Sequence, residues 1–165
     1  TPSPEMARPI AAALLQWANE HHCERIISPG GIPILEDGSG RKKHTHKVYA
    51  VGSTTRARKP LEKEGMAELG SGMVTGVPGI LLNEGRWANF PVVTLLVEVH
   101  GSGIEADPAL EVLEKIGKLV PDCSLDLKKA KPKIENIIER IGELRHQAKP
   151  TQEQHSDQLM YTFDL

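Results

Sequence analysis

GSGMVTGVPGILLNEGRWANFPVVTLLVEVHGSG, the stretch over residues 70–103, decides the fold of this chain. Its first part places glycines at 70, 72, 76 and 79 ahead of an apolar run, which predicts a turn leading into a helix over residues 76–87. Its second part, residues 90–99, is β-branched and apolar without alternation, which is typical of a strand buried on both faces of a parallel sheet. A helix followed directly by such a strand indicates an α/β fold.

Further elements are expected on both sides of this stretch. In the first helix, apolar residues and one histidine recur at helical spacing and predict its buried face: Ile10, Leu14, Trp17, Ala18 and His21. Another helix is expected over residues 56–69, and one more is expected to begin after Asp107 as N-cap. The last helix is expected to begin after Asp126 as N-cap, and Pro132 is expected to kink it or delay its start. The remaining strands are expected over residues 25–28, closed by Pro29-Gly30-Gly31, and over residues 47–53.

Three convincing strands are few for a parallel sheet, and the chain begins Thr1-Pro2-Ser3-Pro4 without an initiator methionine. We therefore expect one α/β domain over residues 1–149, as a fragment of a longer chain, and a polar tail over residues 150–165. A net charge of −2 gives no reason to expect nucleic acid or a membrane surface as a partner. Two cysteines, far apart in sequence, favour a reducing cytoplasm over a disulfide framework.

The glycine turn at residues 70–79 lacks the spacing of a dinucleotide fingerprint and the Gly-Lys-Ser/Thr ending of a P-loop, so it predicts a structural turn. Neither Ser71 nor Ser102 stands in a Gly-x-Ser-x-Gly elbow. The histidines near Cys23 and those at 44 and 46 lack zinc-ligand spacing. We expect no catalytic residues, no cofactor and no metal.

The glycine turn, the following helix and the strand over residues 72–98 resemble the proteasome assembly chaperone family. Three further segments carry the same resemblance: the turn and helix start at residues 105–109, the last helix after Leu125, and the section up to Pro33 with its Gly30-Gly31 pair. The resemblance therefore reaches about Gln147. Archaeal and bacterial relatives often bear an ATP-grasp label, which no residue here supports.

The resemblance implies a three-layer α/β/α sandwich with a mostly parallel sheet, similar to nucleoside phosphorylases and hydrolases, that lacks the family's N-terminal section. It also implies a non-catalytic protein that binds proteasome α subunits or the core particle. Some relatives dock through a tail ending hydrophobic-Tyr-any residue, and Met160, Tyr161 and Thr162 fit those residue types. The chain continues for three residues beyond Thr162, so packing of this segment on its own domain is the alternative.

Two further expectations follow. The aliphatic stripes of the helices over residues 108–147 predict a homo-oligomer. The competing function is a nucleotide- or nucleoside-binding enzyme of the ATP-grasp ligase or phosphorylase-like type, with a site near the turns at Gly70–Gly79 and His100–Gly103.

Overall fold

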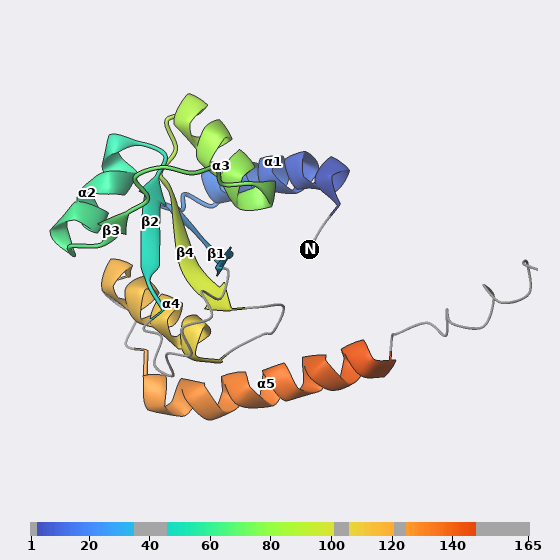
Figure 1. The fold of residues 1–165 in the computed structure, drawn as a ribbon. Helices are drawn as coiled ribbons and strands as arrows, with labels where there is room; N and C mark the ends of the chain where they lie inside the picture. Colours follow the sequence, from blue (N-terminus) through green and yellow to red (C-terminus); the bar gives the residue numbers. More distant parts are fainter. Residues whose placement is uncertain (1–2, 35–45, 101–105, 121–124, 148–165) are drawn as a thin grey trace, which may run out of the picture.

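A computed structural model of the chain describes residues 3–34, 46–100, 106–120 and 125–147. Its strands form one sheet in the order β1-β4-β2-β3, and helices cover both faces (Figure 1). The elements, in chain order, are α1 (Pro4–Glu20), β1 (Ile26–Ile34), β2 (Val48–Gly52), α2 (Thr55–Lys63), β3 (Ala67–Glu68), α3 (Gly76–Trp87), β4 (Val92–His100), α4 (Ala106–Leu119) and α5 (Leu127–Gln147).

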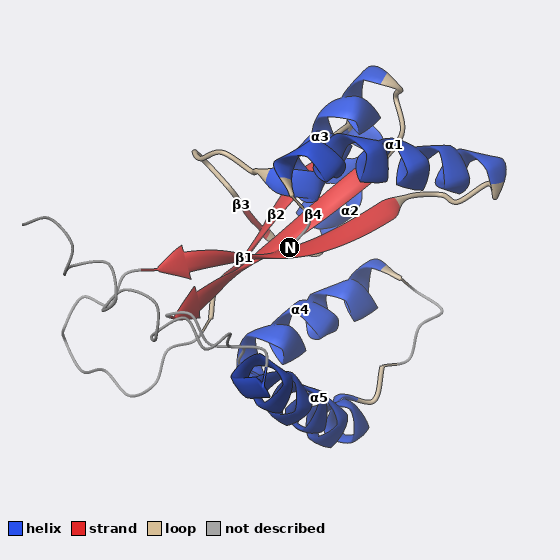
Figure 2. Cartoon of the chain, turned by 90° about the vertical axis from the view of Figure 1, so that its right-hand side faces the viewer, coloured by secondary structure: helices blue, strands red, loops and turns tan. Residues whose placement is uncertain are grey.

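Two apolar clusters define the three layers. On one face of the sheet, α1 and α3 pack together over Phe90 and Val92, around the fully buried Leu81. On the other face, α2 and α4 pack over the alternate β4 residues Val93, Leu95 and Val97. Helix α5 lies outside α4, further from the sheet (Figure 2). The predicted three-layer α/β/α architecture is therefore confirmed.

Strand β4 is the central strand of the sheet. It pairs in parallel with β1, where Ile26 faces Val92, but antiparallel with β2, where Val48 faces Val97. The sheet is thus mixed, since β2 and β3 are again parallel to each other. Two of the three strand pairs are parallel, so the sheet is mostly parallel, as the resemblance implies. The antiparallel pairing of β2 with β4 fits the apolar run as well, because burial of β4 on both faces requires only that helices cover both faces.

Strand β1 continues through Pro29-Gly30-Gly31, where the sequence predicts its end. The strand lies at the edge of the sheet, where a proline costs no ladder hydrogen bond if its missing N–H would face away from the neighbouring strand. Pro29 and Pro33 both occupy exposed positions of the strand. At Gly30 an added Cβ would lie 3.1 Å from Leu96 Cδ2, so glycine allows the close contact with β4.

Helix boundaries depart from the predictions in two places. Helix α2 ends at Lys63 rather than near residue 69, because Gly65 adopts a left-handed φ of 60° and turns the chain into β3. Helix α4 begins at Ala106, so Asp107 lies inside the first turn instead of capping it. Asp126 does cap α5, since its Oδ1 accepts from the backbone N–H groups of Lys128 and Lys129.

The buried hydroxyl of Thr94 yields a stability prediction. Its Oγ1 is fully buried and has no hydrogen-bond partner in the described part of the chain. Valine keeps the shape and removes the desolvated oxygen, so we expect Thr94→Val to raise the free energy of unfolding by about 1–2 kcal/mol in urea denaturation.

The matched control for this substitution is Thr54→Val. Thr54 caps α2 by accepting a hydrogen bond from the Ala57 N–H at 3.2 Å. Loss of that cap is expected to lower stability by about 1 kcal/mol. A loss of stability in both variants would contradict the assignment of Thr94 as an unsatisfied buried group.

Candidate functional site

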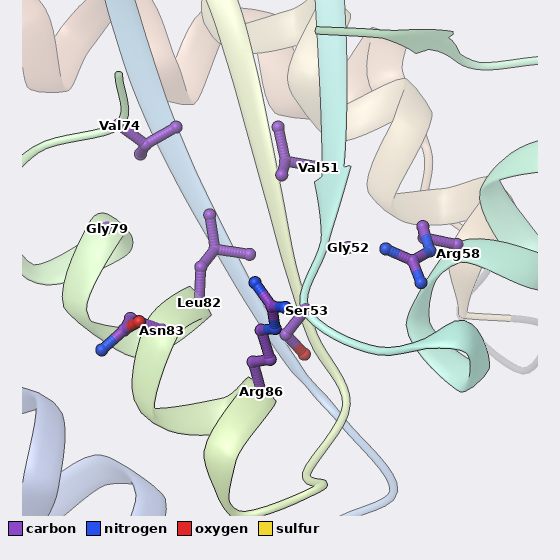
Figure 3. Close-up of a pocket in the computed structure, with 9 residues that line it drawn as sticks. All are labelled: Val51, Gly52, Ser53, Arg58, Val74, Gly79, Leu82, Asn83 and Arg86. Atoms are coloured by element: carbon purple, nitrogen blue, oxygen red, sulfur yellow. The ribbon is translucent and has the colours of Figure 1, made fainter. Parts of the chain in front are cut away.

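A cavity of about 450 Å³ opens between α2, α3 and the end of β2 (Figure 3). The turn after β2 and the loop after β3 both reach it, so it lies at the carboxyl ends of these two parallel strands, where ligands bind in many α/β sheets. The residues that line it are Val51, Gly52, Ser53, Arg58, Val74, Gly79, Leu82, Asn83 and Arg86.

Two glycines shape the walls of the cavity. A Cβ at Gly52 would lie 2.8 Å from Arg58 Cγ and 3.0 Å from Arg58 N, so glycine lets α2 start close to the strand end. A Cβ at Gly79 would clash with the Val74 carbonyl oxygen, so glycine lets the loop before α3 fold back onto the helix. Any larger residue at either position would displace a wall of the cavity.

The cavity is lined by polar side chains of three kinds: two arginines, a serine that is hydrogen-bonded to the backbone, and an asparagine. Arg58 extends from α2 and Arg86 from α3, and both guanidinium groups point into the space between the helices (Figure 3). The Ser53 hydroxyl donates to the Phe90 carbonyl at 2.9 Å and accepts from the Val92 N–H at 2.8 Å, so it joins β2 to β4. Asn83 points away from the arginines (Figure 3). Among the residues that the structure describes, no carboxylate, histidine or cysteine lines the cavity.

A second cavity, of about 620 Å³, lies beside the glycine turn that the sequence singled out. Residues 69 and 71–78 form one wall, and residues 29–33 with Leu96 form the other. None of its lining residues in the described part of the chain carries an acidic, basic or thiol side chain, so these residues supply no general acid or base. Gly72 and Gly76 have φ values of 143° and 67°, which explains glycine at these positions by backbone geometry. The backbone conformation of the turn thus favours glycine at both positions.

The other residues considered for chemistry are dispersed. The His21 ring stacks on Trp17, with centroids 4.3 Å apart, and its Nδ1 lies 2.8 Å from the Trp17 carbonyl oxygen. His46 Nδ1 lies 3.0 Å from the Glu98 carbonyl oxygen. No group of three or more potential metal ligands gathers among the described residues. Ser102, Gly103, Cys123, Met160, Tyr161 and Thr162 lie outside the described residues.

Tyr49 and Glu98 join β2 to β4 on one face of the sheet. The Tyr49 hydroxyl donates to Glu98 Oε1 at 3.0 Å, while the Lys47 backbone N–H donates to Glu98 Oε2 at 3.3 Å. The hydrogen bond to the carboxylate, then burial and the negative charge, raise the pKa of Tyr49 above 10.0. Since folding favours the protonated hydroxyl, this contribution to stability is complete below pH 10 and is lost as the pH rises through the raised pKa.

The raised pKa of Tyr49 predicts the pH at which its hydroxyl loses the proton. The chain has two tyrosines, so Tyr161→Phe leaves Tyr49 as the sole tyrosine. We expect its tyrosinate absorbance to appear with a midpoint above pH 10 and to return towards pH 10 when Glu98→Gln removes the charge. A midpoint at or below pH 10 in the folded protein would contradict the contact.

The buried face of α1 differs from the predicted one. The helix packs through mostly small residues, Ala7, Ala11, Leu15 and Ala18, whereas Leu14, Trp17 and His21 from the predicted face are exposed. Met6, Ile10, Leu14 and Trp17 form a second apolar stripe beside the first, which we call the α1 outer stripe. Its Met6 and Trp17 are 52% and 55% exposed. The helical spacing of the apolar residues predicted a single buried face. The apolar residues of α1 cover an arc wide enough for two stripes, and this width is the signal in the sequence that the prediction missed.

Helix α5 carries a comparable surface on the other side of the sheet. Its apolar residues pack only partly against α4, and the helix extends beyond the end of α4 (Figure 1). Ile137 is 56% exposed and Leu144 is 62% exposed. We call these two residues the α5 outer surface. No helix among the described residues is long and apolar enough to span a bilayer.

Comparisons with known proteins place the chain among characterised folds. The sequence pattern of the PAC2 family matches residues 1–145. Two crystal forms of Pyrococcus furiosus PbaA, described as an archaeal homolog of proteasome-assembly chaperone, match 90% of this chain at 27% and 28% identity with TM-scores of 0.67 and 0.70. Pyrococcus furiosus PbaB, described as an archaeal proteasome activator, matches 88% of the chain at 20% identity with a TM-score of 0.65, a likeness in fold.

This chain spans 61% and 66% of the length of the two PbaA chains and 61% of PbaB. A search of curated proteins finds no match.

Proposed function

The chain belongs to the PAC2 family, and from that premise we propose that it is a proteasome-assembly-chaperone-like binding protein without covalent chemistry of its own. The observation that carries the proposal is the match to PbaA, with 28% identity and a TM-score of 0.70 over 90% of the chain. The partners we propose are proteasome α subunits or the core particle.

The two cavities described above offer little for acid–base catalysis, which favours binding. Among the described residues, those that line the cavity between α2 and α3 include two arginines but no carboxylate or histidine, and those that line the cavity beside the glycine turn include no titratable group. The competing enzyme function was predicted near the Gly70–Gly79 and His100–Gly103 turns. The described side chains around the first turn include no catalytic group, and residues 101–103 of the second turn lie outside the described residues. A cytoplasmic location stays a prediction from the cysteine count.

Two apolar surfaces on opposite faces of the sheet support an assembly role. The α1 outer stripe lies on one face and the α5 outer surface on the other (Figure 2). A protein that uses α5 to bind copies of itself keeps α1 available for a second partner. We propose that α5 mediates homo-oligomerisation and that the α1 outer stripe contacts the proteasome subunit, since Trp and Met are enriched in the cores of protein interfaces.

Retention of proteasome α subunits from the source organism on the immobilised chain tests the function. We expect retention by the unmodified protein and a reduction of about tenfold or more in affinity for Trp17→Ala, because an interface tryptophan typically contributes 2 kcal/mol or more. Gln16→Ala, an exposed polar position on the same helix, is the control and should bind normally. Absence of retention at low salt would refute the function, and unchanged binding of Trp17→Ala would refute the docking surface.

The tail segment gives a separate proposal. Met160, Tyr161 and Thr162 are the partner-binding residues that the resemblance implies, and Tyr161→Ala in the same retention assay tests them. Weaker retention would support docking of the tail. Normal retention would favour the alternative, in which the segment packs on its own domain.

A further inference from the structure

Arg58 and Arg86 bring two guanidinium groups from different helices to one cavity (Figure 3). In the described part of the chain, neither is in an ion pair. Glu62, one turn after Arg58 on α2, is not paired with it, and Glu84 beside Arg86 lies 3.9 Å from Arg8 instead. Both arginines are exposed to solvent and line one cavity of about 450 Å³, so their charges favour the entry of an anion.

The geometry of the guanidinium group indicates the class of anion. Its planar fork donates two parallel hydrogen bonds to a carboxylate or a phosphate, which a lysine ammonium does not do. The glycine at position 52 contributes to this arrangement, since an added Cβ would lie 2.8 Å from Arg58 Cγ and push the side chain out of its place.

The remaining wall of the cavity is aliphatic. Val51, Val74 and Leu82 line the same cavity as the arginines, and Figure 3 shows Leu82 beside the Arg86 guanidinium. Apolar walls with a few convergent polar groups, in a volume of this size, are typical of sites for small ligands. An aliphatic group attached to the anion would cover these residues while the anion meets the arginines.

We propose that this cavity binds an oxyanion, a carboxylate or a phosphate, carried on a compact aliphatic body. The oxyanion lies between Arg58 and Arg86, and the aliphatic body lies against Val51, Val74 and Leu82. The site is separate from the α1 outer stripe and from the α5 outer surface, so it does not depend on binding to the proteasome.

Titration of the isotope-labelled full chain, followed by NMR at low ionic strength, tests the site. The probes are N-acetyl-leucine for a carboxylate, 3-methylbutyl phosphate for a phosphate, and N-acetyl-leucinamide as the neutral analogue. We expect saturable shifts of the Gly52 and Gly79 amides with one or both anionic probes and weaker binding with added salt. The stronger anionic probe identifies the source of the oxyanion. The neutral amide should bind at least tenfold more weakly.

Charge-removing variants assign the site to the two arginines. Arg58→Gln and Arg86→Gln should each weaken binding about tenfold or more, because each removes a charged hydrogen-bond donor to the oxyanion. Arg56→Gln removes an exposed cation of α2 that does not line the cavity, and should bind normally. No shift with any probe, equal binding of the neutral amide, or full binding by both Arg58→Gln and Arg86→Gln would overturn the proposal.

Discussion

Gly85→Ala is expected to lower the free energy of unfolding by about 2–3 kcal/mol, the largest change in stability we predict for the addition of one methyl group. Gly85 is buried in α3 against the first residues of β4. An added Cβ would lie 2.6 Å from Val92 Cγ2 and 3.0 Å from the Phe90 carbonyl oxygen. Val92 is fully buried in the central strand and cannot move aside without disturbing the sheet.

Gly142→Ala is the matched control, since Gly142 also lies within a helix. Apart from the backbone of its own helix and the adjacent residues, no described atom lies within 4 Å of a Cβ added there, so the substitution brings only the higher helix propensity of alanine. We expect it to raise stability by about 0.5–1 kcal/mol. Urea denaturation of both variants checks the pair. Loss of stability at Gly142, or no loss at Gly85, would contradict the packing of α3 on β4.

Ile137→Glu is expected to convert the proposed homo-oligomer into a monomer of 18.1 kDa. Ile137 is one of the two residues of the α5 outer surface and is 56% exposed in the single chain. If copies of the chain pack there, the introduced carboxylate is buried without a partner, at a cost of several kcal/mol. Light scattering coupled to size-exclusion chromatography measures the mass directly.

Asn136→Glu adds the same charge at the neighbouring exposed position and should leave the oligomer intact, since it lies off the apolar stripe. Thermal unfolding of both variants separates dissociation from misfolding. A monomeric unmodified protein at all concentrations would contradict self-association through α5. An Ile137→Glu variant that stays oligomeric would place the interface elsewhere.

The sequence predicted most of the architecture because strongly periodic or continuously apolar segments have few alternatives. The helix over residues 76–87 and the apolar strand that follows it are both present with nearly the predicted bounds. The capping role of Asp126 was also predicted correctly, because a cap is a local interaction between residues a few positions apart. The α/β fold class and the family resemblance rest on these same segments.

Errors arose where a neighbour in space decides the outcome. Pro29-Gly30-Gly31 has the composition of a turn, yet the edge position of β1 lets the strand continue through it. Trp17 has the composition of a core residue, yet α3 approaches the adjacent stripe of small side chains and leaves Trp17 exposed. The sequence of β4 likewise does not indicate whether β2 pairs with it in the parallel or the antiparallel direction.

The stretch over residues 70–103 contains features that the sequence predicts and features that only the tertiary structure explains. By itself, the sequence determined that a glycine-rich turn precedes a helix and a fully buried strand, because backbone freedom and hydropathy are properties of the residues. Only the tertiary structure decided why Gly79 and Gly85 must be glycine, and that Arg58 and Arg86 share one cavity. Those facts depend on distances between segments far apart in the chain, which no local pattern encodes.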